Sequence, residues 1–215
     1  MSSEAHKARQ MIEKEKLLFA NGRWHSPSEC LWSVDTSLSD QISIGAIYAS
    51  LKGFFVTRLL VKSLTTAILV SDLMKRATAK TPLKCDDAKA LIFKINTMLA
   101  TDDLNSTLQA KFDELANTKC FPVKRGDGGV QLRDAGAKFA IVDHERFGRA
   151  FQERADLLDF SLDEVQRLRP FLEATNLRDN YLSDLVEEVS EVTGNSVESS
   201  ELTIQLRSLA YALFW

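Results

Sequence analysis

Apolar residues recur at helical spacing through the first half of the chain. Over 44–59, apolar side chains fall at i, i+3 and i+4 positions, which predicts a helix that breaks or kinks at Gly53. The same spacing predicts three further helices, over about 64–77, 86–99 and 104–115. We therefore expect a helical body over 40–117. Phe55 lies on the first apolar stripe, and most of the set Phe54, Phe55, Phe93 and Phe112 is expected in the core.

The hydrophobic period shortens to two after this helical body. The runs "KCFPVK" and "VQLR" flank "RGDGG", in which Asp127-Gly128 is typical of a hairpin turn because glycine accepts a positive φ. The run "FAIVD" predicts a third strand. Together these runs predict a small antiparallel β-meander over about 119–143.

Helical signals return in the acidic remainder of the chain, 144–215. Asp143 is expected to cap a short helix over "HERFGRAF", and Ser161 with Glu164 forms the pattern of a capping box. The last helix is expected to begin near Ser199 and to end in the apolar run "LAYALFW". An apolar helix without a C-cap indicates either a truncated segment or one that a partner covers.

The N-terminal stretch 4–19 predicts a polar helix, and the loop after it contains Trp24 and Trp32. We expect this loop to pack against the body, because two exposed indoles would leave much apolar area in water. The chain then divides into 1–39, the N-terminal helix and loop, and 40–215, a single domain. The expected fold class is α+β and mostly helical.

Charge is unevenly distributed along the chain, whose formal net charge is −3. Residues 151–215 carry a net charge of −8, and residues 1–150 carry +5. The overall balance does not suit a general nucleic-acid binder, so no nucleic-acid partner is expected. The basic front and acidic back could attract each other within one chain or between two, although solvated helix faces are the simpler explanation.

Neither a signal peptide nor a membrane span is indicated. The start, "MSSEAHKARQMIEKEK", is too polar for a leader, and the most apolar stretch, "FFVTRLLVKSLTTAILV", is 17 residues long and contains Arg58 and Lys62. Three cysteines, an odd number without CxxC spacing, indicate free thiols in a reducing compartment. We expect a cytoplasmic or nuclear protein without a membrane partner.

Patterns that could carry chemistry are weak. The stretch "GDGG" has the spacing of neither kind of phosphate loop. The Asp-His-Glu run at 143–145 places consecutive helical side chains about 100° apart, so they do not converge on a metal. A cysteine hydrolase stays open as an alternative, with Cys30 beside His25 or Cys120 beside His144. No catalytic, cofactor-binding or metal-ligating residue is assigned.

Five phrases between Trp24 and Ser183 resemble, in the same order, stretches of the sacsin and NO VEIN-like family, with its fungal members in particular. They are "WHSPSECLW", "IYASLKGFFVTRLLV", "DDAKALIFKIN", "CFPVKRGDGGVQLRDAGAKFAIVDHERFGRAF" and "LLDFSLDEVQRLRPFLEATNLRDNYLS". In that family the matching region follows a GHKL-type ATPase. This chain has no acidic N-box and no DxGxG nucleotide motif, so the resemblance implies the non-catalytic middle region without ATP binding.

The resemblance and the missing motifs predict a non-catalytic protein-interaction or scaffold module that uses no cofactor. Two alternatives are the cysteine-dependent hydrolase and a fungal effector or self-recognition protein. We expect a protein partner, or self-association through the apolar C-terminal helix. The side chains expected to contact a partner are Trp24, Trp32, Lys124, Arg125, Tyr211, Phe214 and Trp215.

Overall fold

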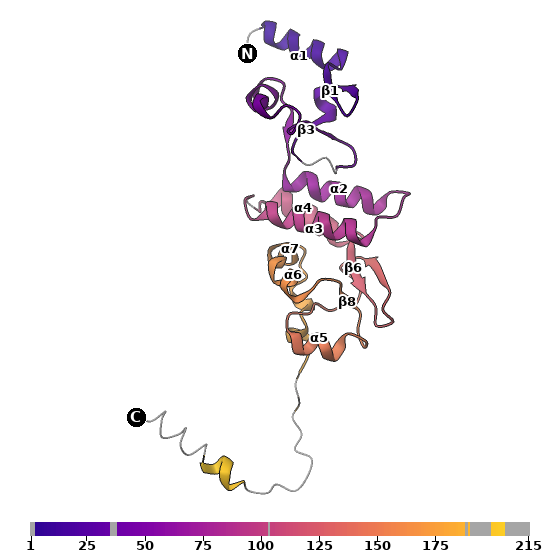
Figure 1. Cartoon of the computed structure of the whole chain (residues 1–215), viewed down its shortest axis with the longest axis vertical. Coiled ribbons are helices and arrows are strands. Elements are labelled where there is room, and N and C mark those ends of the chain that lie inside the picture. The colour runs from indigo at the N-terminus through magenta and orange to yellow at the C-terminus, as the bar shows by residue number, and fades with distance from the viewer. Residues whose placement is uncertain (1–2, 35–37, 103, 188, 190–198, 205–215) are drawn as a thin grey trace, which may run out of the picture. The chain divides into compact units, whose positions relative to one another are not determined.

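A computed structural model describes residues 3–34, 38–102, 104–187, 189 and 199–204. The chain divides into two units, Met1–Leu185 and Val186–Trp215, and each is described by itself. In the second unit, residues 200–204 are helical. The first unit contains the helices and strands labelled in Figure 1, and it is mixed α+β and mostly helical, as the sequence predicted.

Residues 18–63 form a region of short strands and helical turns, which we call the N-terminal lobe. Strands β1 (Leu18–Ala20) and β2 (Arg23–His25) form an antiparallel hairpin. Its turn residues, Asn21 and Gly22, have φ values of 50° and 76°. These left-handed angles suit asparagine and glycine, so the Asn-Gly pair specifies the hairpin locally.

A second sheet in the N-terminal lobe is parallel, with the strand order β4-β3-β5. Its strands are β3 (Cys30–Trp32), β4 (Ile42–Ser43) and β5 (Lys62–Ser63). Three helical turns connect these strands to the rest of the lobe: η1 (Pro27–Glu29), η2 (Ala49–Leu51) and η3 (Phe54–Arg58). The lobe has its own small core, and helix α1 (Ser3–Glu15) packs Ile12 against it. The buried core residues are Leu18, Ala20, Cys30, Ile44, Phe55, Leu59 and Val61.

The long helix predicted over 44–59 is wrong in its first part. Ile42–Ser43 is a strand, and helical geometry begins at Ala49 and becomes π-helical in η3. The backbone N–H of Ile44 donates to the Leu31 carbonyl at 3.0 Å, which ties this segment to β3. Because that bond replaces an intrahelical one, Ile44 is buried by sheet pairing and not by a helix face.

The three helices predicted after this segment are confirmed. They are α2 (Thr66–Thr78), α3 (Cys85–Leu99) and α4 (Ser106–Ala116), which lie against one another in Figure 1. The side chain of Asn105 accepts a hydrogen bond from the Leu108 N–H at 2.9 Å and caps the start of α4.

The predicted hairpin is also confirmed, as β6 (Phe121–Lys124) and β7 (Val130–Arg133). Gly128 in its turn has a φ of 89°. The third strand predicted from "FAIVD" is wrong, because β8 (Leu157–Leu158) occupies the other edge of β6. Ala140 bridges Leu157 while Ile141 bridges Tyr181, so adjacent residues pair with different segments and form no ladder.

The remaining helices of the first unit are short. They are α5 (Glu145–Phe151), α6 (Leu162–Arg167), α7 (Arg169–Ala174), η4 (Arg178–Asn180) and α8 (Leu182–Leu185). The capping box at Ser161 and Glu164 is confirmed at the start of α6. The cap predicted at Asp143 is wrong for α5, whose N-cap is His144. Asp143 instead accepts from the N–H and hydroxyl of Ser183, at the beginning of α8.

Helices α2 to α4, the β6–β7–β8 sheet and helices α6 and α7 enclose a second and larger core. Its largest fully buried side chains include Phe112, Phe121 and Phe171. The loop before β4 is tied to α2, because the buried carboxylate of Asp72 accepts from the N–H of Ser39 at 3.0 Å and from the Ser39 hydroxyl. This polar contact adds to the apolar packing of Leu38 and Leu64 against the larger core.

Candidate interaction surface

Exposed aromatic side chains gather on the N-terminal lobe, beginning at the β1–β2 hairpin. The rings of Phe19 and Trp24 lie on neighbouring strands, with centroids 5.1 Å apart. The Tyr48 hydroxyl donates to the Phe19 carbonyl at 2.9 Å, which fixes the tyrosine against the hairpin. Despite these contacts, the Trp24 side chain is 59% exposed to solvent.

The aromatic contacts continue from Tyr48 to η3. The ring of Phe55 lies 4.8 Å from that of Tyr48 and 5.4 Å from that of Phe54, measured between centroids. Phe55 is 3% exposed, whereas Phe54 is 48% exposed. Two sets of ring contacts, Phe19–Trp24 and Tyr48–Phe55–Phe54, are therefore linked by the hydrogen bond from the Tyr48 hydroxyl to the Phe19 carbonyl. We call Phe19, Trp24, Ile47, Tyr48, Leu51 and Phe54 the aromatic surface.

Exposed basic side chains accompany the aromatic surface. Lys52 and Arg58 flank Phe54 in sequence, whereas Arg23 precedes Trp24 in β2 and lies on the opposite face of the hairpin. Within the part of the chain that the structure describes, none of these three forms an ion pair. The whole segment 41–71 contains no aspartate or glutamate. The surface is thus both apolar and positively charged.

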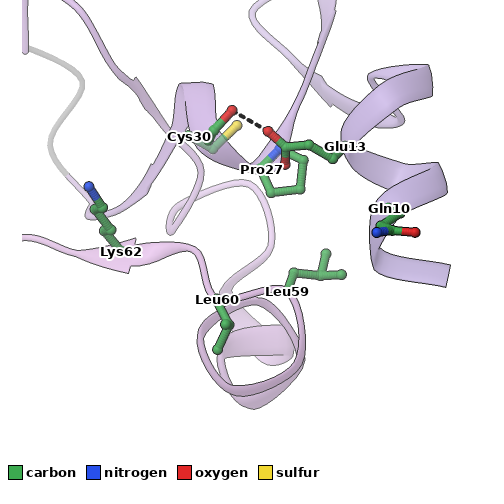
Figure 2. A pocket seen from close by; sticks show the side chains of 8 residues that line it. Gln10, Glu13, Pro27, Cys30, Leu59, Leu60 and Lys62 are labelled. Carbon is green, nitrogen blue, oxygen red and sulfur yellow. Dashed lines mark hydrogen bonds between the residues drawn. The ribbon is translucent and has the colours of Figure 1, made fainter. Parts of the chain in front are cut away.

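A pocket of about 440 Å³ opens between α1 and the end of η3. Figure 2 shows Leu59 and Leu60 on one of its sides and Gln10 and Glu13 of α1 on another. The carboxylate of Glu13 accepts a hydrogen bond from the Ser28 hydroxyl there. The lining mixes these groups with Pro27, Cys30 and Lys62, so it offers no set of polar groups converging on one point.

The thiol in this pocket is not activated. Cys30 is 1% exposed, and burial, together with the nearby charges of Glu29 and Glu13, raises its pKa to about 11. Burial, with Asp134, raises the pKa of Cys120 to about 12. A nucleophilic cysteine needs a lowered pKa, so both thiols stay protonated and unreactive at neutral pH.

The two histidines that were paired with these cysteines contact other groups. His25 lies 3.3 Å from the Ala20 carbonyl and 3.6 Å from the Glu29 carboxylate. The ring of His144 lies 5.8 Å from that of Phe147, between centroids. Neither cysteine owes any part of its pKa shift to a histidine. The structure therefore gives the cysteine hydrolase no support.

The residues expected to contact a partner lie in separate places. Trp24 is exposed on the aromatic surface, while Trp32 is half-buried against Phe55, with ring centroids 5.8 Å apart. Lys124 and Arg125 lie at the end of β6, about the hairpin turn, where Arg125 pairs with Asp127 at 3.2 Å. The other three, Tyr211, Phe214 and Trp215, lie outside the described residues.

Most of the four phenylalanines of the helical body were expected in the core, and Phe55 and Phe112 are buried, Phe93 is half-buried and Phe54 is 48% exposed. Phe54 and Phe55 are consecutive and cannot both face inward from one helical turn. The apolar period selected Phe55 for the inner face, which the structure confirms, although the helix starts later than predicted and widens to π geometry.

A protein-family model, a domain of unknown function (DUF8348), matches residues 67–186, more than half of the chain. The chain belongs to this family. The DUF8348 region extends from α2 to α8 and contains most of the larger core. The aromatic surface precedes it in the chain and lies wholly outside the match. Comparisons with curated proteins and with solved structures gave no match.

Among the described residues, no helix is both long and apolar enough to cross a membrane. Nor does that part of the chain bring three or more His, Cys, Asp or Glu side chains together in a way that could hold a metal ion.

Proposed function

We propose that this DUF8348 protein is a non-catalytic protein-interaction or scaffold module, and that a partner binds its aromatic surface. The observation that carries the proposal is the pair of exposed rings held by neighbouring rings, Phe54 on buried Phe55 and Trp24 on Phe19, with Tyr48 hydrogen-bonded between them. Aromatic side chains and arginine are enriched where proteins bind one another, and contiguous exposed apolar surface marks such sites.

The anchoring of the exposed rings supports binding over chance exposure. Phe54 packs edge-on against Phe55, and Trp24 packs against Phe19, so neither ring is free to fold away from water. A partner would find both side chains already ordered and would lose little conformational entropy in fixing them. Such pre-organised aromatic residues are typical of binding hot spots.

The resemblance to the sacsin and NO VEIN-like family supports the same proposal from the sequence. Its five phrases correspond to the region that follows the ATPase in fungal members, and this chain carries no nucleotide motif of its own. We propose that the chain acts in the cytoplasm or nucleus as a binding module without ATPase activity. The raised pKa values of Cys30 and Cys120 argue against the hydrolase as an alternative.

Affinity capture from cells tests the aromatic surface directly. The test variant is Trp24→Ala/Phe54→Ala, and the matched control is Leu104→Ala/Val130→Ala, which truncates side chains of similar exposure in the DUF8348 region. We expect the wild type and the control to retain the same partners and the test variant to lose them. Equal retention by all three proteins would contradict the proposal, provided that the captured partners bind the purified chain directly.

Self-association through the apolar C-terminal run is a separate proposal, and it comes from the sequence alone. Light scattering of the chain with and without residues 199–215 measures it. A dimer that dissociates on truncation is the expected result. A monomer in both cases would remove Tyr211, Phe214 and Trp215 from the proposed contacts and leave the aromatic surface as the binding site.

A further inference from the structure

We propose that the occupant of the aromatic surface is an acidic amphipathic segment of a partner protein. This inference rests on the proposed function, because it names the chemistry of the partner that the surface binds. The apolar side of the segment would cover Trp24 and Phe54, and its carboxylates would pair with Lys52 and Arg58.

The helical turns η2 and η3 present apolar and basic groups side by side. Leu51, Phe54 and Arg58 are spaced at i, i+3 and i+7, which places them along one face of a helical segment. Leu51 is 47% exposed and Phe54 48% exposed, and Arg58 is exposed as well. An amphipathic segment that lies along this face meets two apolar side chains followed by a guanidinium group.

Among the described residues, no carboxylate of the N-terminal lobe or of α1 forms an ion pair with Lys52 or Arg58. Glu29 accepts from the Lys16 ammonium at 2.7 Å and from the Ser26 N–H at 3.0 Å, and hydrogen bonding to Lys16 lowers the pKa of Glu29. Glu13 accepts from the Ser28 hydroxyl. Both acids are therefore already engaged by Lys16 and by the residues that form η1.

A carboxylate-bearing partner therefore gains new pairs without breaking existing ones. Lys52 and Arg58 have no ion-pair partner among the described residues, so nothing in that part of the chain competes for them. A basic partner would instead place like charges against them, which disfavours binding. Charge complementarity thus selects an acidic segment over a neutral or basic one.

An anionic bilayer would also meet basic and aromatic groups, but the geometry favours a protein. Trp24 and Phe54 are each about half exposed, at 59% and 48%, and both rings are held by neighbouring rings. Neither lies on a free loop, because Trp24 belongs to β2 and Phe54 begins η3. Such a shallow, fixed surface suits coverage by partner side chains better than deep insertion into acyl chains.

Two designed peptides and one vesicle preparation serve as probes. The peptides are amphipathic helices of about 18 residues with leucine on one face and either glutamate or lysine on the other. The vesicles contain phosphatidylserine and phosphatidylcholine. Binding to the full chain is measured by fluorescence anisotropy for labelled peptides and by co-sedimentation for vesicles, each over a range of salt concentrations.

The charge-reversal variant is Lys52→Glu/Arg58→Glu, and its matched control is Lys119→Glu/Lys138→Glu, which changes net charge equally at exposed lysines of the DUF8348 region. We expect the glutamate peptide to bind the wild type and the control alike, and to bind the charge-reversal variant about tenfold more weakly or worse. Its affinity should fall as salt rises.

Several outcomes would overturn the inference. If both peptides bind equally and the Trp24→Ala/Phe54→Ala variant loses both, the surface binds proteins but does not select acidic ones. If vesicles bind through the same residues while the glutamate peptide does not, the occupant is an anionic membrane. If no probe binds, the acidic occupant is refuted, and the capture experiment still decides the proposed function independently.

Discussion

The N-terminal lobe and the DUF8348 region treat their apolar side chains differently. Among its described residues, the lobe has seven exposed large apolar side chains: Phe19, Trp24, Val34, Ile47, Leu51, Phe54 and Leu60. The longer DUF8348 region has three in its described part: Leu104, Val130 and Leu185. The DUF8348 region therefore buries most of its large apolar side chains, whereas the N-terminal lobe leaves many of them exposed to solvent.

Element length explains much of this difference. The DUF8348 region begins with helices of 13, 15 and 11 residues, each long enough to bury one face along several turns. The strands of the parallel sheet in the N-terminal lobe have two or three residues, and η3 has five. Such short elements cannot enclose many side chains, so the lobe combines a small core with exposed rings. This difference agrees with the proposed function, in which the N-terminal lobe carries the binding surface.

Truncating one phenylalanine in each region provides the largest expected contrast. Phe112 is fully buried and packs against Phe171, with ring centroids 6.1 Å apart, whereas Phe54 is 48% exposed. Phe112→Ala is expected to lower the free energy of unfolding by about 3–5 kcal/mol, because it removes buried area and leaves a cavity. Phe54→Ala is expected to lower it by less than about 1 kcal/mol. Urea unfolding followed by circular dichroism measures both.

A large loss of stability on Phe54→Ala would break the comparison. It would mean that the exposed ring supports the fold of the lobe and is not kept for a partner. Phe55→Ala is the matched control within the lobe, since Phe55 is 3% exposed and adjacent in the sequence. We expect Phe55→Ala to resemble Phe112→Ala in direction, because both remove a ring from a core.

The sequence allowed the regular part of the fold to be predicted, because that part follows local rules. Helices α2, α3 and α4 each carry a full apolar stripe, and the β6–β7 hairpin carries an Asp-Gly turn with φ of 89° at Gly128. The capping box at Ser161 and Glu164 is likewise a contact between residues three apart. Each of these signals lies within one element.

The parts that could not be predicted depend on pairing between distant segments. Strands of two residues, such as β4 and β8, are too short to show a period of two. Asp143 caps α8 across 40 residues of sequence, which no local pattern indicates. The candidate surface was found only in part for the same reason: Trp24 was expected to contact a partner, but the contacts of Tyr48 with Phe19 and Phe55 need the folded lobe.

The two buried thiols allow a comparison of the regions by pH. Burial is the main cause that raises the pKa of Cys30 in the lobe to about 11 and that of Cys120 in the DUF8348 region to about 12, from an ordinary value of 9.0. The folded state therefore favours the protonated thiol. This contribution is fully present below pH 9 and is lost as pH rises through the folded pKa, amounting to about 2–3 kcal/mol for Cys30.

We expect the free energy of unfolding to decline above pH 9. The contribution of Cys30 in the lobe should be fully lost at a lower pH than the contribution of Cys120 in the DUF8348 region. Thermal unfolding across alkaline pH measures the decline, and Cys30→Ala should reduce its first part.

At neutral pH, iodoacetamide should modify the partly exposed Cys85 before either buried thiol, as mass spectrometry can show. Rapid alkylation of Cys30 under those conditions would contradict its burial and would reopen the hydrolase.

The smallest expected effect concerns Leu60, at the rim of the pocket in Figure 2. Its φ of 57° is left-handed, and it ends η3, where the Val61 N–H donates to the Phe55 carbonyl at 3.0 Å. A leucine in this conformation costs about 1–2 kcal/mol, which glycine avoids. Leu60→Gly should therefore leave the free energy of unfolding unchanged or raise it by up to about 1 kcal/mol, despite the loss of half-buried apolar area.

Leu51→Gly is the matched control, because Leu51 is similarly exposed but helical, and it should lose about 1 kcal/mol. Urea unfolding of both variants measures the two free energies of unfolding. If Leu60→Gly lowers the free energy of unfolding as much as Leu51→Gly does, the Leu60 side chain stabilises the lobe by more than its left-handed backbone conformation costs.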